Sequence, residues 1–134
     1  MTRGVRTMST ATMTELESNK AQLESQMESF AILGSALKAG KATKRLTESL
    51  RSDYGYTDVE QSDALDTYLQ AVSEDVLETA TDMRGRRIIV LCTGGPHCEI
   101  VGNRVSCWGW FGDGKTYRNL KASERYAIEY LFDF

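Results

Sequence analysis

The chain has 134 residues, of which 41% are hydrophobic, and its formal net charge is −3. This length allows one domain, or a domain with an arm, to bury a core without disulfides or metal. No apolar run approaches the roughly 18 residues that span a bilayer. The first residues, which include Arg3 and Arg6, lack the apolar segment of a secretory signal. With only three cysteines, an odd number, the chain is predicted to be cytoplasmic rather than membrane-bound or secreted.

The charged residues are unevenly distributed. Residues 52–83 contain nine acidic residues and no lysine or arginine. The segments 1–51 and 84–134 each contain eight basic and five acidic residues. The chain is therefore basic, then acidic, then basic along its length, which its net charge does not show.

The N-terminal third predicts a tail and a long helix. Residues 1–11 have the composition of a disordered tail. Thr12 and Glu15 then form a capping-box pattern, and Gly40 is a natural residue after a helix end. Between them, apolar residues recur every seven positions, at Leu16, Leu23, Phe30 and Leu37. We therefore expect a helix over 12–40.

The helix is not predicted to form a long coiled coil. Lys20 and Gly34 interrupt the second apolar seam, which argues against a long coiled coil.

The next segment, 43–53, fits two structures. Leu46 and Leu50 are four residues apart, as in a helix, whereas the alternation of residue types also fits an edge strand.

The acidic segment predicts an amphipathic helix over 58–82. Thr57 and Glu60 form a second capping-box pattern. Apolar residues follow at helical spacing, at Leu65, Leu69, Val72, Val76 and Ala80. Acidic residues fall opposite this stripe, at Glu60, Asp63, Glu74 and Glu78. The helix is therefore expected to carry an acidic outer face.

The C-terminal half predicts a small sheet. RRIIVLCT is apolar on both faces, as in a buried central strand. Gly102 and Asn103 fit the two-residue loop of a hairpin, which places Cys98 directly opposite Cys107. Ser123 is expected to cap a final helix.

These elements predict an α+β fold. Its small antiparallel β-sheet has about three strands, lies within residues 86–118 and is packed by the helices 58–82 and 124–132. The sheet and these helices form an α+β domain over 41–134, and the helix 12–40 is an arm or lid.

The rare residues of the hairpin do not predict catalysis. Adjacent strand residues point to opposite faces, so His97 and Cys98 do not meet. The spacing of His97 and the three cysteines is not that of a zinc site. Nothing marks an oxyanion hole or an acid that would orient His97. We therefore expect two packed thiols at Cys98 and Cys107, whose oxidation to a disulfide stays open. No enzymatic activity, metal or cofactor is predicted.

The acidic helix carries the stronger functional signal. Carboxylates about 6 Å apart along a helix approach the charge density of a phosphate backbone and attract a basic groove. Trp108 and Trp110 share a strand face and are either aromatic anchors for a partner or covered by the last helix. The predicted partner-binding residues are Glu60, Asp63, Asp66, Glu74, Asp75, Glu78, Trp108 and Trp110.

The C-terminal half also resembles a group of small accessory proteins of phages and mobile elements. The resemblance rests on the segment IIVLCTGGPHCEIVG with its T-G-G-P turn, the following Trp-containing strand and the aromatic end YLFDF. It covers about 50 residues, from Arg86 to Phe134. The resemblance implies an inhibitor of host defence, of the anti-CRISPR or anti-restriction kind, and implies no functional residues.

The function expected from the sequence is that of a non-enzymatic binding protein. It would occupy the basic, nucleic-acid-binding surface of a host protein or ribonucleoprotein with its acidic helix, without a membrane or a small-molecule substrate. One alternative is a structural module that forms a homodimer through residues 13–39. Another is a small nucleic-acid-binding regulator that uses the basic N-terminal region, with Lys38, Lys41, Lys44, Arg45 and Arg51.

Overall fold

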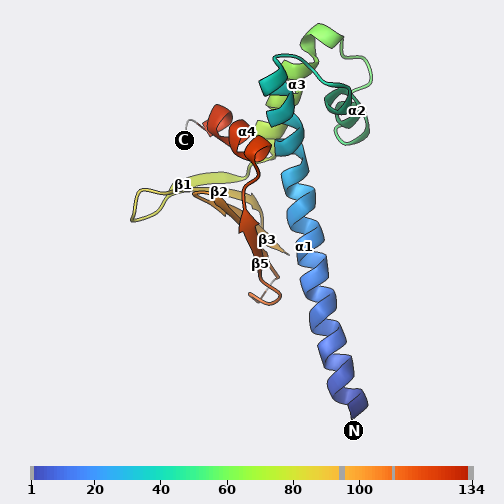
Figure 1. The fold of residues 1–134 in the computed structure, drawn as a ribbon, viewed down its shortest axis with the longest axis vertical. Coiled ribbons are helices and arrows are strands. Elements are labelled where there is room, and N and C mark those ends of the chain that lie inside the picture. Colours follow the sequence, from blue (N-terminus) through green and yellow to red (C-terminus); the bar gives the residue numbers. More distant parts are fainter. Residues whose placement is uncertain (1, 94–95, 110, 133–134) are drawn as a thin grey trace. The chain divides into compact units, whose positions relative to one another are not determined.

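The fold is α+β, as the sequence predicts. The computed structural model describes residues 2–93, 96–109 and 111–132, which form four helices and one five-stranded antiparallel sheet (Figure 1). The chain divides into two compact units. The first comprises Met1–Gln26 and Leu77–Asn119, and the second comprises Met27–Val76 and Leu120–Phe134. The division falls inside the N-terminal helix.

The N-terminal helix, α1, comprises Thr2–Ala39. It therefore includes residues 2–11, for which the composition predicts a disordered tail, and it continues through the capping-box pattern at Thr12. Extending a helix that has already formed fixes one residue for each hydrogen bond gained, so such a segment can continue it. The helix ends where predicted. Gly40 follows it with a φ of +72°, and its backbone N–H donates to the Leu37 carbonyl at 3.2 Å.

The sheet has five strands, two more than the sequence predicts. The strands are β1 (Glu78–Thr81), β2 (Arg87–Cys92), β3 (His97–Val101), β4 (Arg104–Trp108) and β5 (Thr116–Asn119), and they pair in chain order. The predicted hairpin register is confirmed, since Val101 pairs with Arg104 and Cys98 pairs with Cys107. Gly102 has a φ of +58°, which the first position of such a loop requires.

The prediction of a single helix over 58–82 was wrong at both ends. Helix α3 comprises only Gln61–Asp75, and its N-cap is Glu60, whose side chain makes no capping hydrogen bond. The chain leaves the helix at Val76, and Glu78 begins β1. The cause is β2, whose free edge offers the backbone a ladder of hydrogen bonds. The Leu77 N–H already donates to the Val90 carbonyl at 3.0 Å.

Within the first unit, α1 is tied to the sheet by polar contacts. The buried Asn19 amide donates to the backbone carbonyls of Asp113 and Gly114, at 3.2 and 2.9 Å. Arg118 donates to both carboxylate oxygens of Glu24, at 2.7 and 2.8 Å. The buried apolar residues of this unit are Leu23, Ile89, Leu91, Cys98, Ile100, Val105 and Cys107. These contacts hold the β4–β5 loop and β5 in place.

The second unit is helical. The ambiguous segment 43–53 forms helix α2, Lys44–Ser52, which Thr43 caps by accepting from the Leu46 N–H at 3.2 Å. The last helix, α4, comprises Ala122–Phe132. It begins before Ser123, the predicted cap, because the Glu124 carboxylate accepts from the Lys121 N–H at 2.7 Å. The largest buried side chains include Met27, Phe30, Leu33, Leu46, Leu50, Tyr68, Val72 and Ile128.

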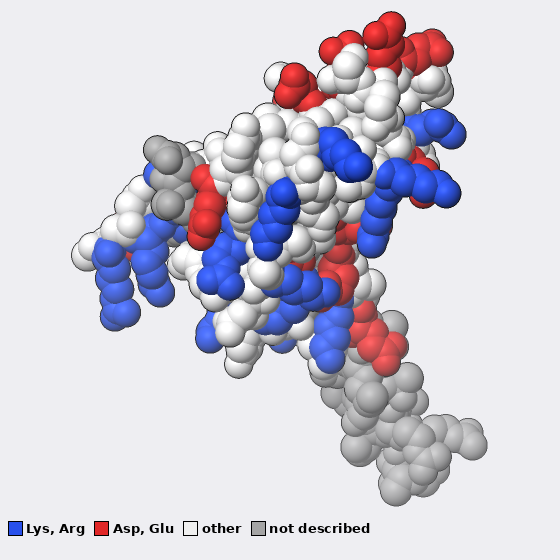
Figure 2. Space-filling view, turned by 45° about the horizontal axis from the view of Figure 1, so that its top comes forward, with Lys and Arg blue, Asp and Glu red and all other residues white. Residues whose placement is uncertain are grey.

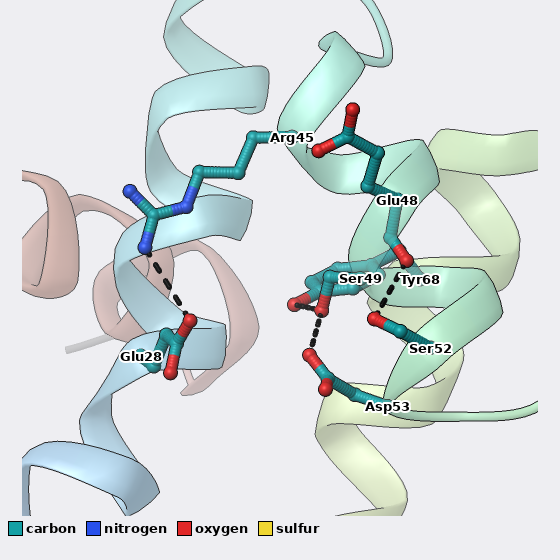
Figure 3. Close-up of polar contacts among 7 residues, drawn as sticks. All are labelled: Glu28, Arg45, Glu48, Ser49, Ser52, Asp53 and Tyr68. Atoms are coloured by element: carbon teal, nitrogen blue, oxygen red, sulfur yellow. Dashed lines mark hydrogen bonds and ion pairs between the residues drawn. The ribbon is translucent and has the colours of Figure 1, made fainter.

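A hydrogen-bonded group joins α2 to α3 in this unit (Figure 3). The Ser49 hydroxyl donates to the Asp53 carboxylate at 2.6 Å and lies 3.0 Å from the Tyr68 hydroxyl. Ser49 carries one hydrogen, and it is used on Asp53, so Tyr68 donates to Ser49. Arg45 of α2 also pairs with Glu28 of α1 at 3.4 Å, and both of these side chains are exposed.

Candidate functional site

The sheet has one buried and one open face. Along β3 and β4, side chains alternate, so that Cys98 and Val105 are fully buried while His97 and Arg104 lie on the other side. The strand pairing extends the open face onto β5, because Ser106 is opposite Tyr117. The open face therefore collects polar and aromatic side chains from three neighbouring strands.

A groove of about 640 Å³ lies on this open face, and every residue that lines it belongs to the first unit. Its lining is chemically mixed. Basic side chains come from Arg86, Arg104 and Lys115, aromatic rings from Trp108 and Tyr117, and neutral polar groups from Asn103, Ser106 and Asn119. Glu99 is the acidic residue in the lining. Lysine and arginine side chains protrude from the surface over this unit (Figure 2).

The aromatic rings are held by their neighbours in the sheet. Trp108 stacks on His97, its direct cross-strand partner, with ring centroids 4.5 Å apart and planes inclined by 25°. The Lys115 Nζ lies 5.2 Å from the Trp108 ring centroid, and the Arg104 guanidinium lies 4.6 Å from that of Tyr117. Tyr117 is 58% exposed. Rigid rings beside mobile cations form a surface that can stack on planar groups and reach anions.

The acidic group of the groove is already engaged. The Glu99 carboxylate lies 2.8 Å from the His97 Nε2, so it is hydrogen-bonded within the open face. Arg86 is likewise paired with Asp82, at 2.8 Å. Arg104 and Lys115 are exposed and contact aromatic rings. These two residues consequently supply the most accessible positive charge of the groove.

The predicted partner-binding residues are divided between the two units. Of the acidic set, Asp63, Asp66, Glu74 and Asp75 lie on α3, and Glu60 precedes it. Glu78 lies on β1, in the other unit. All six are exposed, although Glu74 accepts from Gln70 at 2.8 Å and Asp75 from Tyr54 at 2.7 Å. The predicted acidic helix face is therefore shorter than expected and lacks Glu78.

Trp108, the first of the two predicted aromatic anchors, lies on the open face of the sheet and is partly exposed. Trp110 lies outside the described residues. Sequence reasoning missed Arg104, Lys115 and Tyr117, because it did not predict β5 and so did not bring Tyr117 beside β4. The segment Thr116–Asn119 has no apolar alternation, so its sequence gives no clear signal for this strand.

The three cysteines form a row across the buried face. Cys92 pairs with Cys98, and Cys98 with Cys107, on three neighbouring strands. All three are free thiols. Burial raises the pKa of Cys98 and Cys107, and the neighbouring thiols raise that of Cys98 further. Among the residues that the structure describes, no group of three or more His, Cys, Asp or Glu side chains is arranged to hold a metal ion.

Comparison of the chain with protein-family models, with curated proteins and with solved structures finds no match. Within the described part of the chain, no helix combines the length and the apolar character that a membrane crossing requires.

Proposed function

We propose that this protein binds single-stranded nucleic acid on the open face of its sheet. The observation that carries the proposal is the groove lining, in which two aromatic rings and three basic side chains meet on one sheet face. Bases stack on exposed aromatic rings regardless of sequence, and lysine and arginine reach the phosphates. The protein acts by binding and not by catalysis.

The charge distribution supports this proposal. The net charge of −3 argues against nucleic acid only when the chain is taken as a whole. The first unit contains nine basic and seven acidic residues, whereas the second contains seven basic and twelve acidic residues. The groove belongs entirely to the first, positively charged unit. An anionic polymer is therefore attracted to the unit that carries the aromatic rings.

Each group in the groove has a role in this proposal. Tyr117 is the more exposed of the two rings in the groove and serves as the platform for one base. Arg104 and Lys115 turn from the rings toward phosphates, which flexible side chains do at little cost. Asn103, Ser106 and Asn119 offer hydrogen bonds to base edges or sugars. The open groove suits unpaired bases better than a regular duplex.

The test compares two charge reversals of equal size. The first variant, Arg104→Glu with Lys115→Glu, reverses two charges in the groove. The second, Lys41→Glu with Lys44→Glu, reverses two charges in the basic region of the second unit. We expect the groove variant to weaken binding of a fluorescent single-stranded DNA or RNA by at least about tenfold and to reduce the salt slope by about 1.4. The control variant should retain affinity within about twofold. Tyr117→Ala should weaken binding about 5- to 100-fold, as the loss of one stacked base does.

Two outcomes contradict the proposal. One is the absence of binding by the unmodified protein at low salt. The other is an equal loss in both double variants, which would indicate a non-specific effect of net charge. A loss confined to the Lys41 and Lys44 variant would instead favour the basic region that the sequence offers as an alternative.

A second candidate function uses the acidic side chains of α3. Exposed carboxylates gather where this helix begins (Figure 2), and α3 contains no lysine or arginine. Glu60, Asp63 and Asp66 suit the inhibition of a host defence complex by occupation of its nucleic-acid groove. The probe is a purified RNA-guided nuclease. Charge reversal of these three residues should abolish inhibition of DNA loading, and inhibition that survives the reversal would exclude this use of α3.

A further inference from the structure

The hairpin between β1 and β2 ends in a fully exposed methionine. Met83 has a relative exposure of 104%, so its side chain makes no contribution to either core. Arg84, which follows it, is exposed as well. An apolar side chain of this size gains nothing from folding while it stands in water. At the tip of a hairpin, it lies where a binding partner can reach it.

The tip that carries Met83 has a fixed backbone. The Asp82 carboxylate accepts from the backbone N–H groups of Arg84 and Arg86, at 2.9 and 2.8 Å, and from the Arg86 Nε at 2.8 Å. The backbone closes the turn as well, since the Asp82 N–H donates to the Arg86 carbonyl at 2.9 Å. Met83 therefore projects from a preorganised turn, which lowers the entropy lost when it binds.

Arg86 connects this tip to the groove. Its guanidinium is bound by Asp82 in the turn, and the same residue lines the groove on the open face. Beside it lies Gly102, where an added β-carbon would be 4.0 Å from the Arg86 Cδ. Arg84 and Met83 precede Arg86 by two and three residues, so a strand that leaves the groove past Arg86 approaches the tip.

From this arrangement we infer that the hairpin tip binds the end of a duplex that adjoins the single strand in the groove. The inference rests on the proposed function. Proteins that distort nucleic acids press Met, Leu or Phe side chains against base steps, with arginines on the neighbouring phosphates. At a duplex end one face of the last base pair is open, so Met83 can pack on it without unstacking two pairs. Arg84 then contacts the adjacent phosphate.

The experiment compares three DNA probes at one salt concentration: a single strand, the same strand extended by a duplex, and a blunt duplex. We expect the unmodified protein to bind the junction about tenfold more tightly than the single strand, as one additional stacked base permits. Met83→Gln, which keeps the length but not the apolar character, should reduce this preference to about twofold while leaving single-strand affinity unchanged. Met83→Leu should keep the preference.

Leu77→Gln is the matched control, because Leu77 is also an exposed apolar residue of the first unit, at 59%. The Leu77→Gln variant should prefer the junction as strongly as the unmodified protein does. Equal affinity for single strand and junction, or a Met83→Gln variant that keeps the preference, overturns the inference while the proposed function stands. Absence of single-strand binding overturns both. A 2-aminopurine base in the terminal pair reports the contact directly, since only a tip that packs there changes its fluorescence.

Discussion

Gly34 of α1 packs directly on the backbone of Ser123 in the second unit. A β-carbon at Gly34 would overlap the Ser123 carbonyl oxygen and would lie 3.1 Å from the Ser123 Cα. The neighbouring atoms are backbone, which cannot move aside as the end of a flexible side chain does. The contact therefore requires glycine at this position although Gly34 lies inside a long helix.

We expect Gly34→Ala to lower the free energy of unfolding by about 2 kcal/mol. Overpacking against fixed atoms costs about 1–3 kcal/mol or more, and it outweighs the gain of about 1 kcal/mol that Ala brings to a helix interior. Urea denaturation followed by circular dichroism measures the change. Ser35→Ala, at the next, exposed position, should stay within about 0.5 kcal/mol of the unmodified protein. Equal stability of the two variants would contradict this account of the contact.

Gly34 also indicates what the sequence could not reveal. Within the helical pattern it looks like an interruption of an apolar seam, because a pattern records only the preferences of one element. Glycine is required there by the backbone of Ser123, which is 89 positions away in the chain. The hairpin at Gly102 is the opposite case. A two-residue loop fixes the strand register locally, so the pairing of Cys98 with Cys107 follows from the sequence.

The candidate site was predicted less completely than the fold. Its residues become neighbours only through the pairing of β4 with β5. The sequence of β5 lacks the apolar alternation from which a strand is predicted. The same reason explains the missed β1, whose four residues are all exposed. Such a strand forms because β2 offers it backbone hydrogen bonds, which residue periodicity does not record. Glu78 consequently lies in β1 and not in the predicted acidic helix.

The buried thiols should resist alkylation. The thiolate is the reactive form of cysteine, and burial, with the neighbouring thiols, raises the pKa of Cys98. Cys107 is buried as well, whereas Cys92 is partly exposed. Iodoacetamide at about pH 8 should therefore modify Cys92 alone in the folded protein and all three cysteines in urea. Peptide mass spectrometry assigns the sites, and rapid modification of Cys98 in the folded state would contradict its burial.

The β1–β2 turn should loosen in acid. Backbone N–H donation from Arg86, together with its guanidinium and the Arg84 N–H, lowers the pKa of Asp82 below its ordinary value of 3.8. A depressed pKa means that the ionised carboxylate stabilises the turn above the unfolded-state pKa, and that this stabilisation is lost as the pH falls through the folded-state pKa. The amide resonances of Arg84 and Arg86 should therefore titrate with a midpoint below 3.8.

Asp82→Asn is the control for this titration. Asn keeps an oxygen that accepts from the turn amides but has no proton to gain, so the midpoint should disappear from both resonances. A midpoint at or above the ordinary carboxyl value in the unmodified protein would show that the turn does not favour the charged form.

The hydroxyls of Ser49 and Tyr68 should be energetically coupled. Tyr68 is fully buried and donates to Ser49, which donates in turn to Asp53. Tyr68→Phe removes one donor and leaves Ser49 bound to Asp53, so it should cost about 1 kcal/mol. Ser49→Ala removes the partner of both neighbours and should cost about 2 kcal/mol. The double variant should be about 1 kcal/mol more stable than the sum of the two single losses predicts, because in it no tyrosine hydroxyl is left unpaired. Urea denaturation of all four proteins completes the cycle. Strictly additive losses would mean that the two hydroxyls, 3.0 Å apart, do not stabilise the contact between α2 and α3.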